Sequence, residues 1–274
     1  MQQVHANAAR MVGGFQRMVG RNTLLAVDAL GELTILLWRV LVALVKQPQR
    51  RRTVVGQLYH IGYLSLPVVV LTGISTGMVL AVQAYVTLSR VKGETMTGAM
   101  VSYSLVAELA PVLAGLMLAG RVGSSVAAEI GTMKVTEQLD ALSVMGTDPI
   151  AYLVAPRFLA CVLLMPLLTV ICAAVGVGAA DWLSVSVWEI DRGAYWEKIR
   201  SYVDTLDILF GMTKGLVFGG IIALVACRKG LHTQGGASGV GTACTEGVVS
   251  ASILILCTNF VLTLVFQKIN EALG

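Results

Sequence analysis

Five long runs of apolar residues, almost free of charge, dominate the pattern of this chain. Three of the runs contain no Asp, Glu, Lys or Arg, whereas Glu108 is the only charge in the second and Lys214 the only charge in the fourth. A transmembrane helix needs about 20 mostly apolar residues, and a helix satisfies its own backbone hydrogen bonds in lipid. We therefore expect an all-α integral membrane protein with five transmembrane helices, in the runs Thr53–Ser89, Thr95–Gly120, Phe158–Ala180, Ile208–Cys227 and Gly247–Gln267.

The first run has room for more than one span, because it is 37 residues long. Pro67 falls inside it. Proline interrupts the hydrogen bonding of a helix, so we expect a break there, between one span and a re-entrant or interfacial piece.

The segment before the first run has a different pattern. Within Thr23–Val45, three charged residues (Asp28, Glu32 and Arg39) interrupt an otherwise apolar sequence. On a helical wheel they fall, with four flanking basic residues, within about 60° of one another. One polar stripe on an apolar helix is typical of a helix lying in the membrane interface; the alternative is a sixth span whose stripe faces other helices. We expect residues 1–52 to form a cytoplasmic tail with this interfacial helix, and residues 53–274 to form the membrane domain.

The composition excludes several classes of protein. The chain is 56% hydrophobic and 13% charged, with a mean hydropathy of +0.78, whereas soluble domains are about 25% charged. These values exclude a soluble enzyme, a disordered or collagen-like chain and a nucleic-acid-binding protein. If the N-terminus is cytoplasmic, the inner segments hold thirteen Lys and Arg residues and the outer segments six. This asymmetry predicts that the C-terminus lies on the opposite side of the membrane.

Motifs for metal, disulfide or nucleotide chemistry are missing from the sequence. No two of the five cysteines have Cys-x-x-Cys spacing and the three histidines are scattered, so we interpret the cysteines as small buried apolar residues. The sequence Gly236–Gly239 resembles the GxSG of intramembrane serine proteases, but no histidine follows Ser238 to act as its base. There is no P-loop. We expect no cofactor and no catalytic residue, and an ATPase would have to be another chain.

Glu108 and Lys214 are the two charges inside the expected spans. Either charge alone is expensive at the centre of a bilayer, and two opposite charges offset each other. We interpret them as a gate or as the polar lining of a substrate path. The alternatives are a pair that only fixes helix register, or a lysine that reaches out to the surface. Pro111 follows Glu108 by three residues and predicts a kink near that charge.

Small residues form two faces that predict close helix contacts. Gly211, Gly215 and Gly219 share one face of the span that carries Lys214, and Gly73 with Gly77 forms the second. These contacts form either within the chain or between two copies of it.

The segment Gly120–Arg157 is the longest cytoplasmic segment in the expected orientation. It contains apolar residues at helical spacing, and Gly146 can end such a helix. A short amphipathic helix between two spans suits docking to a soluble partner; a helix lying on the membrane surface is the alternative. The apolar face consists of Val135, Leu139, Leu142 and Met145, and Glu137 and Asp140 lie off that face.

The sequence around this segment resembles the MlaE/YrbE family of ABC-transporter permeases, the membrane subunits of MCE-type lipid transporters. The resemblance extends over the body of the chain from about Gly56 to Phe266. One departure is Ala107, where many relatives carry an arginine just before the glutamate. The matching pieces are LVAELAPVLAGL (Leu105–Leu116), GRVGSSVAAEIGTMKVTEQLDALSVMGTDP (Gly120–Pro149), YLVAPR (Tyr152–Arg157) and GGASGVGTACTEGVV (Gly235–Val249).

The resemblance implies a homodimer that pairs with two cytoplasmic ABC ATPase subunits. On the far side it implies an oligomeric MCE-domain protein, and in many bacteria a small STAS-domain protein accompanies the ATPase. It further implies a central cavity for phospholipid or another hydrophobic lipid. In Gram-negative species it implies a place in the inner membrane, where such systems maintain the lipid asymmetry of the outer membrane.

The resemblance also assigns residues to roles. Glu108 and Lys214 match charged positions in the transmembrane core of the dimer, and Gln83 and Tyr85 match the polar and aromatic end of the first span, near the lipid cavity. The segment Gly131–Met145 matches the part that couples to the ATPase. Within it, the residues that we expect to contact the ATPase are Glu137, Leu139, Asp140, Leu142 and Met145.

Two other classes of function are alternatives to an ABC permease. A self-sufficient channel or secondary transporter fits poorly, because only two ionisable groups lie in the spans and the spans show no clear inverted repeat. A non-transporting membrane scaffold has no evident need for a glutamate and a lysine at mid-membrane. Only the permease requires a stoichiometric ATPase.

Overall fold

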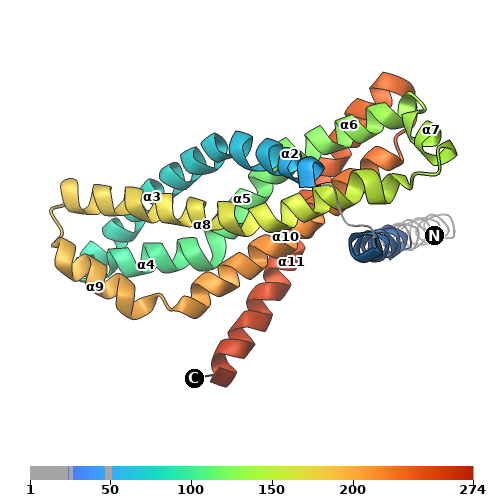
Figure 1. Ribbon diagram of the computed structural model, residues 1–274. Coiled ribbons are helices and arrows are strands. Elements are labelled where there is room, and N and C mark those ends of the chain that lie inside the picture. Colours follow the sequence, from blue (N-terminus) through green and yellow to red (C-terminus); the bar gives the residue numbers. More distant parts are fainter. Residues whose placement is uncertain (1–23, 25–26, 47–50, 274) are drawn as a thin grey trace, which may run out of the picture.

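The computed structural model describes residues 24, 27–46 and 51–273, and all regular elements in these ranges are helices. A helix over residues 27–46 comes first. Figure 1 shows the arrangement of the elements that follow. These are α2 (Arg51–Gly62), η1 (Tyr63–Ser65), α3 (Leu66–Ser89), η2 (Glu94–Met96), α4 (Thr97–Ser104), η3 (Leu105–Leu109), α5 (Ala110–Leu118), η4 (Ala119–Gly123), α6 (Ser124–Val135), α7 (Gln138–Val144), η5 (Ile150–Val154), α8 (Ala155–Ser186), α9 (Arg192–Tyr202), α10 (Thr205–Leu231) and α11 (Gly236–Leu273).

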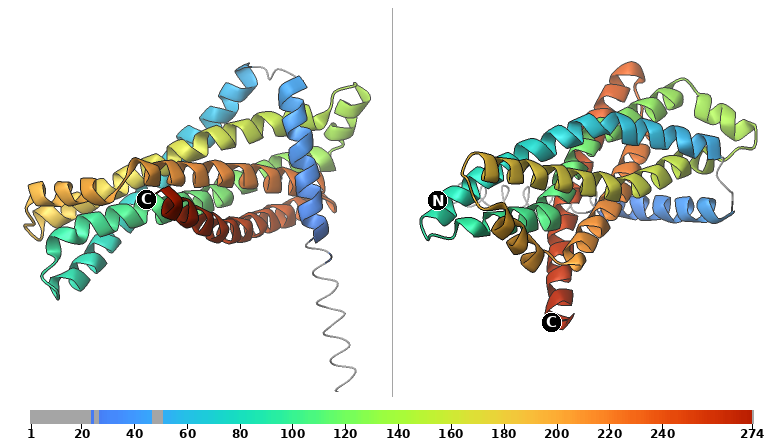
Figure 2. Two further views of the ribbon diagram at one scale, coloured as in Figure 1. Left: turned by 90° about the horizontal axis from the view of Figure 1, so that it is seen from below. Right: turned by 60° about the vertical axis from the view of Figure 1, so that its left-hand side comes forward.

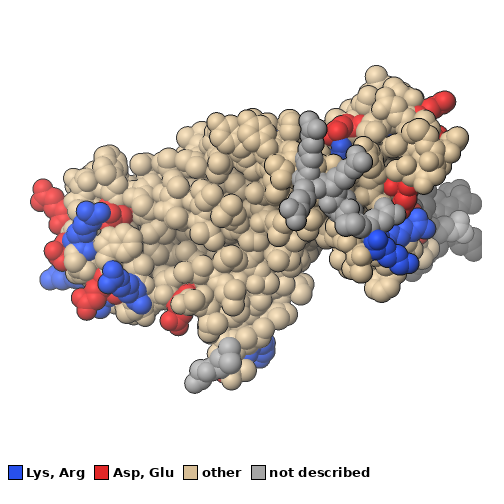
Figure 3. All heavy atoms as spheres, viewed as in Figure 1, with Lys and Arg blue, Asp and Glu red and all other residues tan. Residues whose placement is uncertain are grey.

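Five helical stretches within the described ranges are long and apolar enough to cross a membrane, which confirms the expected number of spans. Charged side chains gather at the two ends of the long axis on the face drawn in Figure 3, and a broad uncharged band separates them. A helical bundle with such a band is a multi-pass membrane protein. The five stretches are Thr53–Ser89, Glu94–Val135, Ile150–Ser186, Thr205–Leu231 and Gly236–Ala272.

The first stretch breaks where proline predicts it. Helix α2 ends at Gly62, one 3-10 turn follows, and α3 starts at Leu66 with Pro67 in its first turn. Proline is tolerated in the first turn of a helix because backbone N–H groups at those positions have no hydrogen-bond acceptor inside the helix. The break therefore separates a short helix, α2, from the full span α3.

The second stretch is one helix of 42 residues that contains two π-helical turns. It continues through α6 to Val135, so the segment after Gly120 begins as helix and is not a loop. The first π turn, Leu105–Leu109, carries Glu108 and ends two residues before Pro111. This is the irregularity that Pro111 predicts, because a π turn accommodates an extra residue where α-helical hydrogen bonding is interrupted.

The glycine faces serve packing within the chain. A Cβ atom added at Gly77 would overlap the carbonyl oxygen of Gly176, and one at Gly73 would lie 2.6 Å from that of Cys172. Helices α3 and α8 therefore cross with their backbones in contact, which only small residues allow. On α10, Gly215 and Gly219 lie against α8 in the same way, with Gly219 next to the Cys161 carbonyl, whereas Gly211 lies against η3.

The helix over residues 27–46 runs across the direction of the spanning helices: it is seen nearly end-on in Figure 1 and crosses them in the left view of Figure 2. Leu36, Val40 and Ala43 are buried. The Glu32 carboxylate pairs with the Arg228 guanidinium at 2.7 Å, and this neighbour lowers the pKa of Glu32 below its ordinary value. This arrangement fits the interfacial helix better than a sixth span.

Helix α11 leaves the bundle toward its C-terminal end (Figure 1). Its outer half exposes large apolar side chains, among them Phe260, Val261 and Leu264. A helix of this kind presents an apolar surface to lipid or to another protein.

Candidate functional site

Glu108 and Lys214 form an ion pair inside the membrane-spanning part of the protein. The Lys214 Nζ atom lies 2.7 Å from Glu108 Oε1, and the lysine side chain is 2% exposed against 38% for the glutamate. Glu108 belongs to the π turn η3 and Lys214 to α10. The structure thus brings together the two charges that the sequence predicts to offset each other.

The Lys214 ammonium group has an acceptor for each of its three hydrogens. Besides Glu108, it donates to the Thr263 hydroxyl at 2.9 Å and to the Ala107 carbonyl at 3.0 Å. Pro111 explains why that carbonyl needs a donor, because proline has no N–H to offer to the residue four positions earlier. The lysine therefore satisfies a backbone group in a place where water is scarce.

Close packing of α10 places the lysine within reach of this carbonyl. A Cβ atom at Gly211 would lie 2.5 Å from the carbonyl oxygen of Val106, so only glycine permits the approach. Lys214 stands almost one turn further along α10, beside the next carbonyl. The glycine face and the charge thus belong to one arrangement of α10 against η3.

Helix α11 completes the polar network on the far side of the pair. The Thr263 hydroxyl donates to Glu108 at 3.0 Å while accepting from Lys214. The Asn259 amide donates to the same carboxylate at 3.3 Å. Three separate segments, η3, α10 and α11, therefore meet at one glutamate.

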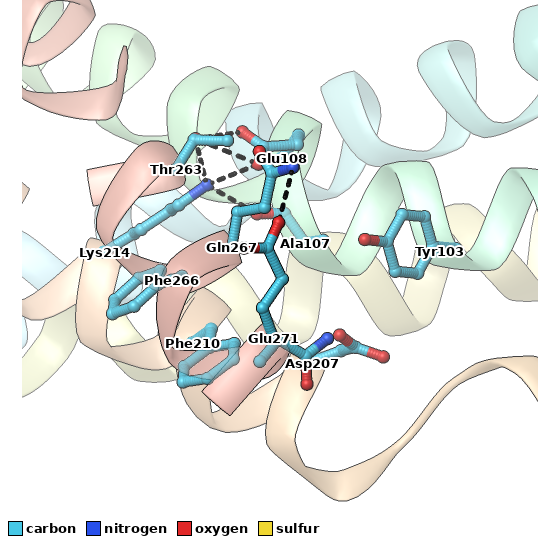
Figure 4. A pocket seen from close by; sticks show the side chains of 11 residues that line it. Tyr103, Ala107, Glu108, Asp207, Phe210, Lys214, Thr263, Phe266, Gln267 and Glu271 are labelled. Atoms are coloured by element: carbon cyan, nitrogen blue, oxygen red, sulfur yellow. Dashed lines mark hydrogen bonds and ion pairs between the residues drawn. The ribbon is translucent and has the colours of Figure 1, made fainter. Parts of the chain in front are cut away.

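A pocket of about 470 Å³ opens next to the pair, between α4, α10 and α11 (Figure 4). Phe210 and Phe266 form one wall, stacked with their ring centroids 4.4 Å apart. Tyr103 lies on the opposite side, and Gln267 with Glu271 points into the space (Figure 4). The pocket thus combines aromatic walls with polar groups, which is the usual make-up of a small-molecule site.

The geometry of the ion pair suits binding better than catalysis. All three hydrogens of Lys214 are engaged, so the group that the pocket meets is the partly exposed Glu108 carboxylate. Separating α11 from η3 would break the bonds of Thr263 and Asn259 to that carboxylate. The network therefore joins the three segments through one carboxylate.

Sequence reasoning missed several members of this site. Thr263 and Asn259 carry no charge, and Phe210 and Phe266 look like ordinary lipid-facing residues. A signal was present, however, because the polar residues of α11 recur at helical spacing. This polar stripe consists of Asn259, Thr263, Gln267 and Asn270.

Gln83 and Tyr85 do not join this pocket. Gln83 lines a separate, smaller groove between α3 and α4. Tyr85 stacks on Trp188 with ring centroids 4.2 Å apart. Within one copy of the chain, the four residues expected along a lipid path therefore lie in three places.

The short helix α7 differs from the expected amphipathic helix. It covers only Gln138–Val144, and Val135 belongs to the end of α6. Leu139 is 4% exposed and packs into the core of this chain, with Leu142 partly buried against it. In one copy of the chain, Leu139 and Leu142 therefore face the protein's own core, whereas Val135 and Met145 of the expected apolar face are exposed.

Other residues of α7 are accessible. Val144 and Met145 are 88% and 70% exposed. Glu137 and Asp140 are exposed as well, and Asp140 pairs with Lys134 at 3.1 Å. Gly146 ends the helix with a φ of 74°, as the sequence predicts. The exposed tip of α7 therefore comprises Glu137, Asp140, Val144 and Met145.

A comparison with known families matches this architecture to one of them. The family model described as Permease MlaE covers residues 54–265. This range includes all five spanning stretches apart from Thr53 at the start of the first and residues 266–272 at the end of the fifth. The chain belongs to the MlaE permease family.

Relatives from distant organisms agree with this membership. A probable ABC transporter permease protein of Rickettsia conorii is 40% identical, over 94% of this chain and 100% of the relative. The intermembrane phospholipid transport system permease protein MlaE of Haemophilus influenzae is 36% identical, over 92% and 97%. The chloroplastic protein TRIGALACTOSYLDIACYLGLYCEROL 1 of Arabidopsis thaliana is 36% identical, over 87% and 69%. This member of the MlaE family is therefore an ABC transporter permease, and the ATPase is a separate subunit.

Proposed function

We propose that this MlaE permease moves phospholipids between the inner membrane and the periplasmic side, and so maintains the lipid asymmetry of the outer membrane. The observation that carries the proposal is the pocket beside the Glu108–Lys214 pair. It lies within the membrane-spanning helices and combines stacked aromatic walls with polar groups. A phospholipid offers matching chemistry, because it has an apolar body and a polar head group. The relative from Haemophilus influenzae carries phospholipid transport in its name.

The same proposal assigns two partners to the two ends of the molecule. A cytoplasmic ATPase binds the end that carries α7, where Val144 and Met145 are exposed. A periplasmic MCE-domain protein binds the end that carries α9, and a STAS-domain protein accompanies the ATPase. This orientation follows the excess of basic residues in the inner segments. It places the chain in a bacterial inner membrane, with residues 1–52 on the cytoplasmic face and residues 53–274 as the permease domain.

The proposed assembly also contains a second copy of the chain. The outer half of α11 exposes Phe260, Val261 and Leu264 after it leaves the bundle. Packing against the same helix of a second copy would bury this surface and close the pocket from the side. Gln83 and Tyr85 then line the lipid path only in the dimer.

A transport assay tests the proposal. The chain is purified with its associated subunits from native membranes and reconstituted in liposomes that contain a fluorescent phospholipid. We expect a stoichiometric ATPase and lipid transfer that requires ATP hydrolysis. Glu108→Ala should reduce the transfer strongly, whereas Glu94→Ala, which removes an exposed carboxylate outside the pocket, should not.

The alternatives give different results in this assay. A self-sufficient channel or secondary transporter would move lipid without ATP and without an ATPase. A scaffold would transfer no lipid in either condition. For the α7 contact, Val144→Asp combined with Met145→Asp should abolish co-purification of the ATPase while the permease still inserts. Unchanged binding of the ATPase by this double variant would rule α7 out as the docking element.

A further inference from the structure

A second polar groove lies far from the Glu108 pocket, between α2 and the η4–α6 part of the long helix. It has a volume of about 510 Å³. Its floor is apolar and consists of the buried side chains of Ile61, Val122 and Val126. We call it the α2–α6 groove. Neither the family comparison nor the candidate site described above assigns it a role.

Arg121 points a positive charge into this groove. The residue directly follows the apolar run that ends at Gly120, so it stands at the boundary of the membrane. Its Nη1 donates to the Ser65 hydroxyl at 2.6 Å, and Ser65 is 1% exposed at the 3-10 break between α2 and α3. The break therefore holds the guanidinium in a fixed orientation.

No carboxylate among the described residues neutralises Arg121. The acidic residue of the groove is Glu129, and Arg157 already pairs with it at 2.7 Å. The remaining polar residues on the walls are Gln57, His60 and Ser125, which can all donate hydrogen bonds. The groove therefore has one uncompensated cation, surrounded by neutral donors and above an apolar floor.

The outer surface of α2 indicates the depth of the groove. Tyr59 and Tyr63 stack with ring centroids 5.2 Å apart, and both are more than half exposed. Exposed tyrosines of membrane proteins gather at the level of the lipid head groups. The phosphates of the adjoining leaflet lie at this same level.

We propose that the α2–α6 groove binds the phosphate of a membrane lipid from the leaflet on the α7 side. Arg121 binds the phosphate oxygens, with Ser125, Gln57 and His60 as further donors. The apolar floor accepts the glycerol and the first methylene groups of the chains. A guanidinium is well suited to a phosphate because it offers several donors in one plane. This proposal does not depend on the transport function, since the groove binds lipid whether or not ATP is hydrolysed.

Lipid binding to the full chain in detergent tests the proposal. Native mass spectrometry measures binding of phosphatidylglycerol and of a diacylglycerol with the same acyl chains, which lacks the phosphate. Wild type should prefer phosphatidylglycerol by about tenfold or more, the usual effect of a charge-assisted hydrogen bond. Arg121→Gln should lower this preference clearly, with only the lipid proposed for the Glu108 pocket left unaffected, and Arg121→Lys should keep more of it. The matched control is Arg39→Gln, an exposed cation outside the groove, which should leave it unchanged.

A second variant covers the case in which Arg121→Gln disturbs the fold through the lost bond to Ser65. Ser125 is exposed on the groove wall, so Ser125→Glu should fold normally and repel the phosphate. We expect it to reduce binding of phosphatidylglycerol with no change in the circular dichroism spectrum. An unaltered preference in a folded Arg121→Gln or Ser125→Glu protein would overturn the proposal.

Competition with inorganic phosphate distinguishes a site for a lipid phosphate from a site for a free, soluble phosphate. If the site takes a lipid, excess inorganic phosphate should displace little phosphatidylglycerol, because it gains nothing from the apolar floor. Two results together would show a site for a soluble phosphate. Inorganic phosphate would displace all the phosphatidylglycerol, and inorganic phosphate alone would stabilise the wild type but not Arg121→Gln. That result would overturn the assignment to a lipid.

Discussion

Replacing Glu108 with leucine should destabilise the permease more than replacing Lys214 with methionine. The reason is the unequal burial of the two groups, because the lysine side chain is 2% exposed and the glutamate 38%. Glu108→Leu leaves a buried ammonium without its carboxylate, which typically costs about 3–5 kcal/mol. Lys214→Met leaves a carboxylate that the pocket can hydrate and that keeps Thr263 and Asn259 as donors. We expect a loss of about 1–3 kcal/mol there, the cost of a lost partner in a hydrogen bond.

The double variant and the charge swap complete this experiment. Unfolding of each variant in detergent is followed by circular dichroism, and lipid transfer is measured on the same preparations. Glu108→Leu with Lys214→Met should be more stable than Glu108→Leu alone, because no buried charge is left over. The swap Glu108→Lys with Lys214→Glu should recover part of the transfer. Strictly additive losses, or a larger loss for Lys214→Met than for Glu108→Leu, would refute the reasoning from burial.

Three further predictions concern topology, packing and pH. Cysteines introduced at Ser143 and Asn270, in a chain without its own cysteines, should be labelled from opposite sides of the membrane; labelling from one side would refute the five-span orientation. Gly77→Ala should destabilise the protein by about 1–3 kcal/mol through overlap with Gly176, whereas Gly178→Ala, which has open space around it, should be neutral in the same unfolding measurement. The pKa of Glu32 is lowered, so its contact with Arg228 stabilises the docked N-terminal helix fully at pH values above the ordinary carboxyl pKa of 4.5. This stabilisation is lost as the pH falls through the lowered pKa of the folded protein, where Glu32 becomes protonated. Electron spin resonance distances between labels at Leu41 and Met145 should therefore broaden in acid, and Glu32→Gln should give the broadened distribution at neutral pH.

Much of the fold could be predicted from the chain because lipid leaves a helix few choices. Runs without charge mark the spans, and Pro67 marks the break in the first of them. The pairing of Glu108 with Lys214 could be predicted too, because two opposite charges in lipid each need a partner. The π turns could not. Pro111 shows that the helix is disturbed, but the sequence does not say whether the chain kinks or inserts a residue.

Helix α7 shows a different limit of the sequence pattern. Spacing identifies an apolar face, but it does not say what covers that face. Leu139 turned out to pack on its own chain because α6 continues unbroken to Val135 and brings α7 back against the core. Gln83 and Tyr85 illustrate the same limit, since position along a span does not fix which neighbour a side chain meets.

The unbroken helix Glu94–Val135 can transmit a movement along its whole length. From Glu108 to Val135 it runs for 27 residues, or about 40 Å at 1.5 Å per residue. If the ATPase docks on the tip of α7, as proposed, its push reaches the ion pair through the turn at Thr136–Glu137 and then through this one helix, which contains the two π turns. The rotation between its two ends about the helix axis matters as much as its stiffness. One residue inserted within α6 would turn the tip by about 100° relative to Glu108, so that the proposed push from the ATPase would act in a different direction.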